Sequence, residues 1–338
     1  MPAPASSTSH APIEERPLVT GACGFAGSHL VELLAGRRGI PVDGTYRPAS
    51  DPIPPMLHER LRPHALDVND AAQCREVLAK VRPSHIFHLA GPAHIAESFA
   101  RPSEFARSVF GGTVNLLEAA ASLDPPPRVL LVSSCEVYGE AANLVDPLTE
   151  ETPPLPNNPY GAAKLAAEAY AQFMVRAGRL PIVISRSFNH IGPRQSARFA
   201  TASFAKQLVE AERGIGPRQI RVGNLSAARD VVDVRDVVAG YVLLLERGQT
   251  GEVYNLASGV AVAMSELLQR LIAQVSGSVE VLHDPSRDRP VDVATRRGNA
   301  AKAEALGWTR AYPLERTLGD LLTYWRGTMS SAGRAGGG

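Results

Sequence analysis

The stretch 17-PLVTGACGFAGSHLVELLAG-36 joins a short apolar run to a helical pattern through three glycines spaced three residues apart. Glycines in this position let backbone N–H groups approach a pyrophosphate, which then lies at the positive N-terminal end of the helix. A glycine triplet alone also suits an ordinary tight turn, but its place at the first strand–helix junction predicts a dinucleotide site. The residues that this turn offers to a dinucleotide are Gly21, Gly24, Phe25, Ala26 and Gly27.

The rest of the chain repeats this alternation of strand and helix. Short apolar runs at 17–20, 41–46, 85–90, 128–134 and 181–187 are separated by longer helical patterns. This rhythm predicts an α/β fold of the Rossmann type, a doubly wound parallel sheet covered by helices on both faces. After residue 186 the rhythm breaks, returns near 230–246 and ends in a mixed segment at 258–326.

These changes in pattern divide the chain into two expected domains. We expect 17–188 plus about 230–257 to form the cofactor-binding Rossmann domain. About 189–229 plus 258–326 would form a smaller C-terminal domain that binds the substrate. Residues 1–16 lack the basic start and apolar core of a signal peptide, and 327–338 are small and polar. Both ends are therefore expected to be disordered.

Composition excludes several classes of protein. The 338 residues carry 35 Lys and Arg against 34 Asp and Glu, so no net charge favours a nucleic acid or a membrane surface, and no membrane-spanning run occurs. Three widely spaced cysteines predict neither a disulfide framework nor a thiolate metal site, which favours a cytoplasmic location. His85 and His88 lie in an apolar run without a carboxylate or cysteine pattern, so no metal site is expected.

The second predicted strand ends at Arg47, where a dinucleotide fold places the group that meets the adenosine ribose. A carboxylate there would accept hydrogen bonds from a 2′-hydroxyl, whereas an arginine suits a 2′-phosphate. Arg47 therefore predicts NADP(H), with NAD(H) left open and a solvated surface arginine as the competing interpretation.

Three residues predict a proton-transfer group at the edge of the sheet. Tyr160 and Lys164, in 157-NNPYGAAKLAAEAYAQF-173, share one helical face with only small residues between them. The ammonium of Lys164 would lower the pKa of the phenol, so that Tyr160 serves as an acid or base near neutrality. Ser134, at the end of the run 128–134, would hold the substrate oxygen by a hydrogen bond. The expected substrate group is a hydroxyl or a ketone.

Together, the glycine turn, "HLAG" at 88–91, Ser134 and the pair Tyr160 and Lys164 resemble the extended short-chain dehydrogenase/reductase family over about 17–326. The resemblance implies a Rossmann domain that carries the cofactor, a smaller domain that grips a nucleotide-diphosphate sugar, and a homodimer. It also implies that Asp67 and Val68 meet the adenine and that Leu89 and Ala90 line the cofactor. One departure is Val109, which stands where this family usually has asparagine or aspartate.

Two later loops, 186–195 and 220–237, resemble those of GDP-4-keto-6-deoxy-D-mannose reductases. Amides can bind sugar hydroxyls and guanidinium groups can bind phosphate oxygens, although local salt bridges compete as an interpretation. The expected substrate-binding residues are Asn189, Arg221, Asn224, Arg229 and Arg289.

The expected reaction is NADPH-dependent reduction of the C4 ketone of GDP-4-keto-6-deoxy-D-mannose to GDP-D-rhamnose. The alternatives are a GDP-mannose 4,6-dehydratase, in which Glu136 would be the base at C5, or another epimerase or dehydratase acting on nucleotide sugars. A catalytically silent protein that senses the dinucleotide is the non-enzymatic alternative.

Overall fold

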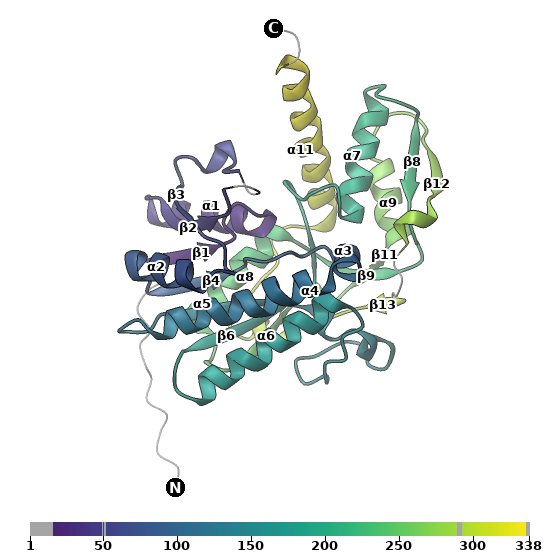
Figure 1. Ribbon diagram of the computed structural model, residues 1–338. Helices are drawn as coiled ribbons and strands as arrows, with labels where there is room; N and C mark the ends of the chain where they lie inside the picture. Colours follow the sequence, from purple (N-terminus) through teal and green to yellow (C-terminus); the bar gives the residue numbers. More distant parts are fainter. Residues whose placement is uncertain (1–15, 49, 51, 289–292, 336–338) are drawn as a thin grey trace.

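The computed structural model describes residues 16–48, 50, 52–288 and 293–335. Most of the predicted leader, the last three residues of the predicted tail and Arg289 therefore lie outside the described residues. The described chain forms a large sheet covered by helices and a smaller lobe beside it (Figure 1).

The large sheet has seven parallel strands in the order β10-β6-β5-β4-β1-β2-β3. Its strands are β1 (Pro17–Thr20), β2 (Val42–Tyr46), β3 (Leu61–Ala65), β4 (His85–His88), β5 (Arg128–Ser134), β6 (Ile182–Ser187) and β10 (Val253–Leu256). From β3 to β6 this is the strand order of a dinucleotide-binding fold. The predicted Rossmann-type α/β fold is confirmed.

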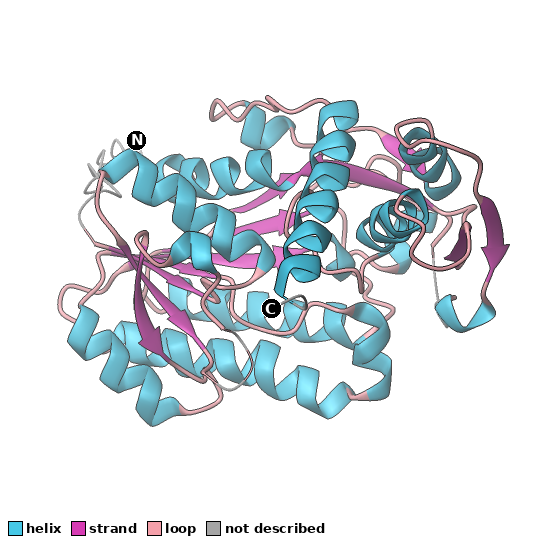
Figure 2. Ribbon diagram, turned by 90° about the horizontal axis from the view of Figure 1, so that it is seen from above, coloured by secondary structure: helices cyan, strands magenta, loops and turns pink. Residues whose placement is uncertain are grey.

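Helices cover both faces of this sheet (Figure 2). One face carries α1 (Phe25–Arg38) and α8 (Val234–Arg247); the other carries α2 (Ala71–Val81), α5 (Gly112–Ala121) and α6 (Pro159–Arg176). Successive side chains of a strand point to opposite faces, so Leu18 and Val19 belong to two different core clusters. This is why the strands read as continuous apolar runs rather than as alternating ones.

The smaller lobe contains two further sheets and a third core cluster. Its four-stranded sheet joins β11 (Ala261–Ala263), β9 (Ala228–Asp233), β13 (Thr295–Arg296) and β7 (Asn189–Ile191), and its second sheet pairs β8 (Gln219–Val222) with β12 (Glu280–His283). The helices α7 (Ala200–Glu212), α9 (Met264–Ile272) and α11 (Leu314–Ala335) enclose the third cluster. Figure 1 shows α7, α9, β8 and β12 together at the upper right.

Short helices connect these elements. They are α3 (Ile95–Ala100), α4 (Pro102–Phe105), a π-helix (Ala106–Gly111), α10 (Ala301–Glu304) and the 3₁₀ turns Pro55–Leu57, Cys135–Val137, Glu140–Asn143 and Pro285–Arg287. Among the described residues, no helix is both long and apolar enough to cross a membrane.

The packing differs from the predicted domain boundaries in three places. Residues 230–233 extend β9 and pair within the small lobe, because the strand continues without interruption until Asp233 caps α8. Ala303 and Trp308 pack into the core of the large sheet, since the Trp308 indole donates to the carbonyl of Asp236. The helix α11 continues beyond residue 327 to Ala335, and Met329 still packs against the third cluster.

Candidate active site

The glycine turn after β1 has a geometry that only glycine allows. Gly21 has φ +69°, and its carbonyl accepts the N–H of Gly24 at 3.0 Å. A Cβ on Gly27 would lie 2.1 Å from the Gly21 oxygen. The turn therefore leaves backbone atoms open at the N-terminus of α1, as a pyrophosphate site requires.

A segment of the small lobe holds this end of α1. The ring of His190 stacks on Phe25 with centroids 5.7 Å apart, and the His29 Nε2 lies 2.9 Å from the carbonyl oxygen of Pro193. Arg194, itself at φ 72°, donates to Ser28. The sequence pattern did not predict this contact between 190–194 and α1.

Thr20 fixes the strand ends next to the turn. Its Oγ1 accepts the N–H groups of Leu89 and Ala90, each at 3.2 Å. The hydroxyl hydrogen is thus directed to the His88 Nδ1, 2.9 Å away. Leu89 and Ala90 are consequently held with defined backbone positions beside the glycine turn.

His88 continues this chain of hydrogen bonds and has a structural role. With its Nδ1 accepting from Thr20, its Nε2–H donates to Thr113 at 3.0 Å, and Thr113 donates to the Val109 carbonyl at 2.6 Å. Burial, aided by the positive charge of Lys164, lowers the pKa of His88 to about 3, so the ring is neutral. No cluster suited to a metal ion occurs in the part of the chain that the structure describes.

Val109 lies in the π-helix and packs beside Tyr160 with Phe105 and Ala163. A π-turn adds a residue to a helix and frequently occurs next to functional sites. The position at which the family resemblance suggests a polar side chain is therefore filled here by an apolar contact.

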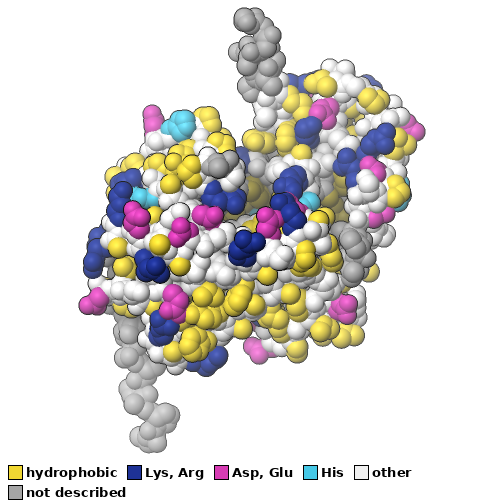
Figure 3. Space-filling model, viewed as in Figure 1, with side chains coloured by type: hydrophobic (Ala, Val, Ile, Leu, Met, Phe, Trp, Pro, Cys, Tyr) yellow, Lys and Arg dark blue, Asp and Glu magenta, His cyan; other side chains and the backbone are white. Residues whose placement is uncertain are grey.

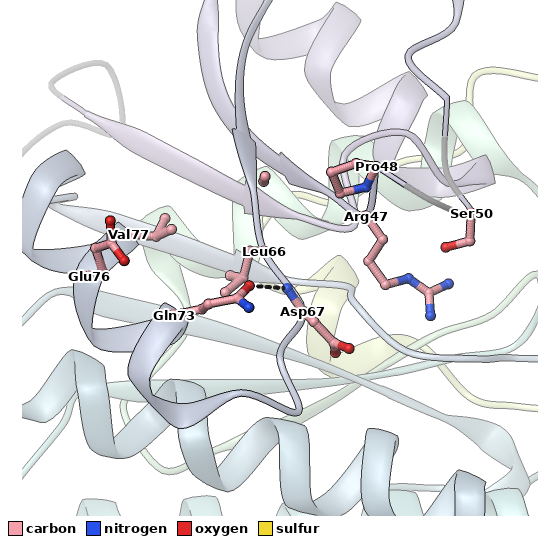
Figure 4. Close-up of a pocket in the computed structure, with 9 residues that line it drawn as sticks. Arg47, Pro48, Ser50, Leu66, Asp67, Gln73, Glu76 and Val77 are labelled. Atoms are coloured by element: carbon pink, nitrogen blue, oxygen red, sulfur yellow. Dashed lines mark hydrogen bonds between the residues drawn. The ribbon is translucent and has the colours of Figure 1, made fainter.

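Two adjoining pockets extend from the glycine turn toward α2. The outer pocket, about 600 Å³, is lined by Arg47, Ser50, Asp67, Gln73 and Glu76 among others (Figure 4). The backbone N–H of Asp67 donates to Gln73, which fixes the strand end there. The inner pocket brings together many of the predicted cofactor residues, namely Gly21, Gly24, Arg47, Asp67, Val68, Leu89 and Ala90.

Ser134, Tyr160 and Lys164 meet at the carboxyl end of β5. Ser134 is the last residue of that strand, and its side chain acts to lower the pKa of Tyr160. The Lys164 ammonium donates to the Val132 carbonyl at 2.7 Å and lies 5.9 Å from the Tyr160 ring centroid. The structure thus brings these three predicted residues together.

The start of α6 explains how Tyr160 comes so close to the sheet. Asn158 caps the helix by accepting the Gly161 N–H at 2.8 Å, and Pro159 occupies the first turn. A Cβ on Gly161 would lie 2.5 Å from the Glu136 carbonyl oxygen. Glycine after Tyr160 therefore lets the helix touch the turn that follows Ser134.

Burial sets the protonation states of this group. It raises the pKa of Tyr160 above its usual value, although Ser134 acts in the opposite direction, so the phenol keeps its proton at neutral pH. It lowers the pKa of Lys164 to about 8, while the carboxylate of Glu168 acts to raise it. The site therefore holds a neutral phenol beside an ammonium that is still largely charged at pH 7.

Glu136 is buried, and both of its carboxylate oxygens have hydrogen-bond partners. Its Oε2 accepts from the Asn158 amide at 2.9 Å, and its Oε1 pairs with the Arg296 guanidinium. Arg296, from β13 of the small lobe, is 2% exposed and was not predicted from the sequence.

The predicted substrate residues occupy different surroundings. Asn189 lies on β7, and its Oδ1 is buried without a hydrogen-bond partner among the described residues. Arg229 is buried on the neighbouring β9 and donates to the carbonyls of Ala228 and Val293. Arg221 and Asn224 are exposed in the other sheet and the loop after it. The structure thus brings Asn189 and Arg229 onto adjacent strands and leaves Arg221 and Asn224 outside that sheet.

A second buried ion pair lies behind Lys164. Glu168, one helical turn beyond Lys164, pairs with Arg186 at 2.7 Å and accepts from the Ser133 hydroxyl. The four-residue spacing from Tyr160 to Lys164 to Glu168 on one helical face was the sequence signal that could have revealed it.

The strand order, the glycine turn and the Ser–Tyr–Lys group define an enzyme of the extended short-chain dehydrogenase/reductase class. Within that class, residues 18–321 match the family model described as GDP-mannose 4,6 dehydratase, and the chain belongs to this family.

Relatives with different reactions resemble the chain over most of its length. It is 33% identical over 316 residues to GDP-6-deoxy-D-mannose reductase from Pseudomonas aeruginosa, covering 92% of this chain and 97% of that protein. It is 29% identical to GDP-mannose 4,6-dehydratase from Sinorhizobium fredii, covering 92% and 97%.

Solved structures of different enzymes also resemble the chain over most of its length. RMD from Pseudomonas aeruginosa complexed with NADPH has a TM-score of 0.76 at 30% identity, over 92% of this chain and 99% of that chain. UDP-glucose 4-epimerase from Thermotoga maritima with UDP-glucose has a TM-score of 0.82 at 28% identity, over 93% and 99%. Reductase, dehydratase and epimerase thus share this architecture.

Proposed function

We propose that this enzyme uses NADPH to reduce the C4 ketone of GDP-4-keto-6-deoxy-D-mannose, giving GDP-D-rhamnose. Its similarity to the Pseudomonas aeruginosa reductase supports the substrate and product. One observation supports a reductase over a dehydratase. The Glu136 carboxylate accepts hydrogen bonds from Arg296 on one oxygen and from Asn158 on the other.

A nicotinamide dinucleotide fits the residues present. The glycine turn leaves a cradle that a Cβ on Gly27 would fill, and Arg47 with Ser50 lines the pocket where a ribose 2′-phosphate would lie. Similar proteins bind NADPH or NAD, and Arg47 favours NADPH. When bound, the reduced nicotinamide supplies the hydride for C4.

The chain's own residues supply the proton and the orientation. Ser134 and Tyr160 hydrogen bond the ketone oxygen, and Tyr160 donates its proton to that oxygen as negative charge develops. Burial suits this direction of reaction, because the raised pKa keeps Tyr160 protonated beforehand. The positive charge of Lys164 then stabilises the phenolate that remains.

A 4,6-dehydratase would need an additional base to remove the proton from C5. Glu136 is the carboxylate expected for that step, but it is buried between Arg296 and Asn158. A carboxylate that accepts from a guanidinium is stabilised in its ionised form and is a weak base. The dehydratase therefore remains the second candidate, and family similarity is what favours it.

The residues that the sequence predicts to bind the substrate are proposed to do so from the small lobe. Asn189, with its unpartnered buried oxygen, is proposed to bind a sugar hydroxyl. Arg229, which donates to two main-chain carbonyls from the same nitrogen, is proposed to bind the diphosphate. Arg221, Asn224 and Arg289 are proposed to complete the nucleotide contacts.

The chain is also proposed to act as a cytoplasmic homodimer. None of the three cysteines, all of which the structure describes, forms a disulfide bond, as suits a reducing compartment. Figure 3 shows hydrophobic side chains gathered on the lower part of one face, where Figure 1 places α6, and Phe173 of this helix is 46% exposed. Light scattering after gel filtration would measure the oligomeric state directly.

Two parallel reactions test the proposed chemistry. One contains the protein with GDP-mannose, and the other contains GDP-4-keto-6-deoxymannose with NADPH. We expect stoichiometric loss of NADPH absorbance and a 4-hydroxyl product only in the second reaction. Formation of the keto sugar from GDP-mannose without net NADPH loss would identify a dehydratase instead.

The Tyr160→Phe variant is the control for the site. It keeps the ring but removes the proton, so turnover should fall by on the order of 10²-fold or more while NADPH binding persists. Tight NADPH binding by the wild-type protein without turnover of any nucleotide sugar would favour the non-enzymatic sensor.

A further inference from the structure

We propose that Arg296 is a positioning residue that determines which reaction this site performs. By pairing with Glu136 it prevents that carboxylate from removing the C5 proton of the bound keto sugar, so that only reduction at C4 remains. The inference rests on the proposed function and adds a residue outside the Ser–Tyr–Lys group.

Glu136 lies close to the reacting group. It belongs to the 3₁₀ turn Cys135–Val137 directly after Ser134, and its backbone N–H donates to the Ser134 hydroxyl at 3.2 Å. Its charge also acts on Tyr160. A carboxylate at this position could therefore remove a proton from the sugar ring, unless another group of the protein pairs with it.

The backbone of Asn158 and that of Arg296, which both hold Glu136, are fixed by their neighbours. The Asn158 Oδ1 accepts the Gly161 N–H as the cap of α6, so its Nδ2 must face the other way, toward Glu136. Arg296 lies in β13, whose parallel pairing sets Thr295 opposite Ala228 on β9. The helix cap thus orients the Asn158 amide, and the strand pair fixes the backbone from which Arg296 reaches Glu136.

Burial makes the pair difficult to separate. Arg296 is 2% and Glu136 is 4% exposed, so water replaces little of the interaction between their charges. Protonation of Glu136 would leave the permanently charged guanidinium of Arg296 facing a neutral acid. Accepting a proton from a sugar is therefore unfavourable for this carboxylate.

The suppressed step can be written in full. The C5–H bond would break, the proton would move to a Glu136 oxygen, and the electron pair would form an enolate on the C4 oxygen beside Tyr160 and Ser134. Return of a proton to C5 restores the ketone, so no oxidant or reductant is consumed. In D₂O the same cycle replaces the C5 hydrogen with deuterium.

The test measures this exchange. Each protein, loaded with NADP⁺ so that reduction cannot occur, is incubated with GDP-4-keto-6-deoxymannose in D₂O, and deuterium at C5 is followed by NMR and mass spectrometry. A protein-free reaction gives the background. We expect the wild-type protein and Arg296→Lys, which keeps the charge, to remain at background.

Arg296→Met should exchange C5 on the order of 10²-fold faster than wild type, the usual contribution of a positioned general base. The double variant with Glu136→Gln should return to background, which a merely loosened structure would not do. Arg296→Gln, which retains a polar side chain, provides the same comparison if the methionine variant does not fold.

Rapid C5 exchange by the wild-type protein would overturn the inference without any variant. So would background exchange by folded Arg296→Met or Arg296→Gln that still binds the keto sugar. Failure of the proposed function would appear separately, as absence of NADPH consumption by the wild-type protein with the keto sugar.

Discussion

Replacing Lys164 with methionine should make the protein inactive but more stable at neutral pH. Lys164 is 9% exposed, and burial lowers its pKa from 10.5 to about 8. Each pKa unit corresponds to about 1.4 kcal/mol, so the buried ammonium costs about 3 kcal/mol of folding free energy below pH 8. Methionine keeps the buried chain and loses the bond to the Val132 carbonyl, worth about 1 kcal/mol. The expected net gain is about 2 kcal/mol.

The difference in stability between the variant and the wild-type protein should depend on pH, and the lowered pKa of Lys164 sets the direction of this change. Between about pH 8 and 10.5 the unfolded chain binds the Lys164 proton more tightly than the folded protein does. The free energy of unfolding of the wild-type protein should therefore rise with pH across this window, whereas the methionine variant lacks this contribution. Urea unfolding of both proteins at pH 7 and pH 9 should show that the difference between their free energies of unfolding narrows by about 1–2 kcal/mol.

Lys80→Met is a matched control, because Lys80 is an exposed lysine on α2. It should give neither the gain at pH 7 nor the change with pH. A Lys164→Met variant that is less stable than wild type at pH 7, or a gap that does not change with pH, would refute the reasoning. That result would mean that Lys164 is better solvated in the folded protein than its burial implies.

Three further outcomes are expected. Gly27→Ala should weaken NADPH binding by more than about tenfold in a fluorescence titration, because the added Cβ would lie 2.1 Å from the Gly21 carbonyl oxygen. Gly36→Ala in the same helix is the control: its added Cβ has no atom within 4 Å, so this variant should bind NADPH normally. Arg47→Gln should raise the KM for NADPH more than that for NADH, and equal changes would contradict a 2′-phosphate contact. Glu168→Gln, checked for folding by circular dichroism, should shift the alkaline limb of the kcat profile to lower pH, because the carboxylate supports the Lys164 ammonium.

The sequence predicted the parts of the fold whose signal is local. The run 128–134 became β5 because seven mostly apolar residues suit a strand buried on both faces. The strand β3 was not predicted, because Leu61–Ala65 contains a proline and exposed polar residues and lies at the edge of the sheet. Tyr160 and Lys164 were recognisable because one helix carries both.

Residues that depend on distant parts of the chain could not be predicted in the same way. Arg296 follows its partner Glu136 by 160 residues, and nothing in 295–296 marks it as part of an active site. The apolar contact of Val109 depends on a π-turn, which has no sequence signal comparable to a glycine turn. In contrast, Glu168 could have been predicted from its spacing along α6.

The separation between Glu136 and Arg296 also has a consequence for how the protein is made. At a translation rate of about 5–20 residues per second, roughly 8–30 s pass between synthesis of the carboxylate and synthesis of its arginine partner. During that interval the carboxylate of Glu136 lacks this partner, although β1 to β5 precede it in the chain. The proposed site is therefore completed late in biosynthesis, when β13 adds to the small lobe, and a chain that stalls before Arg296 would carry Tyr160 in an unfinished site.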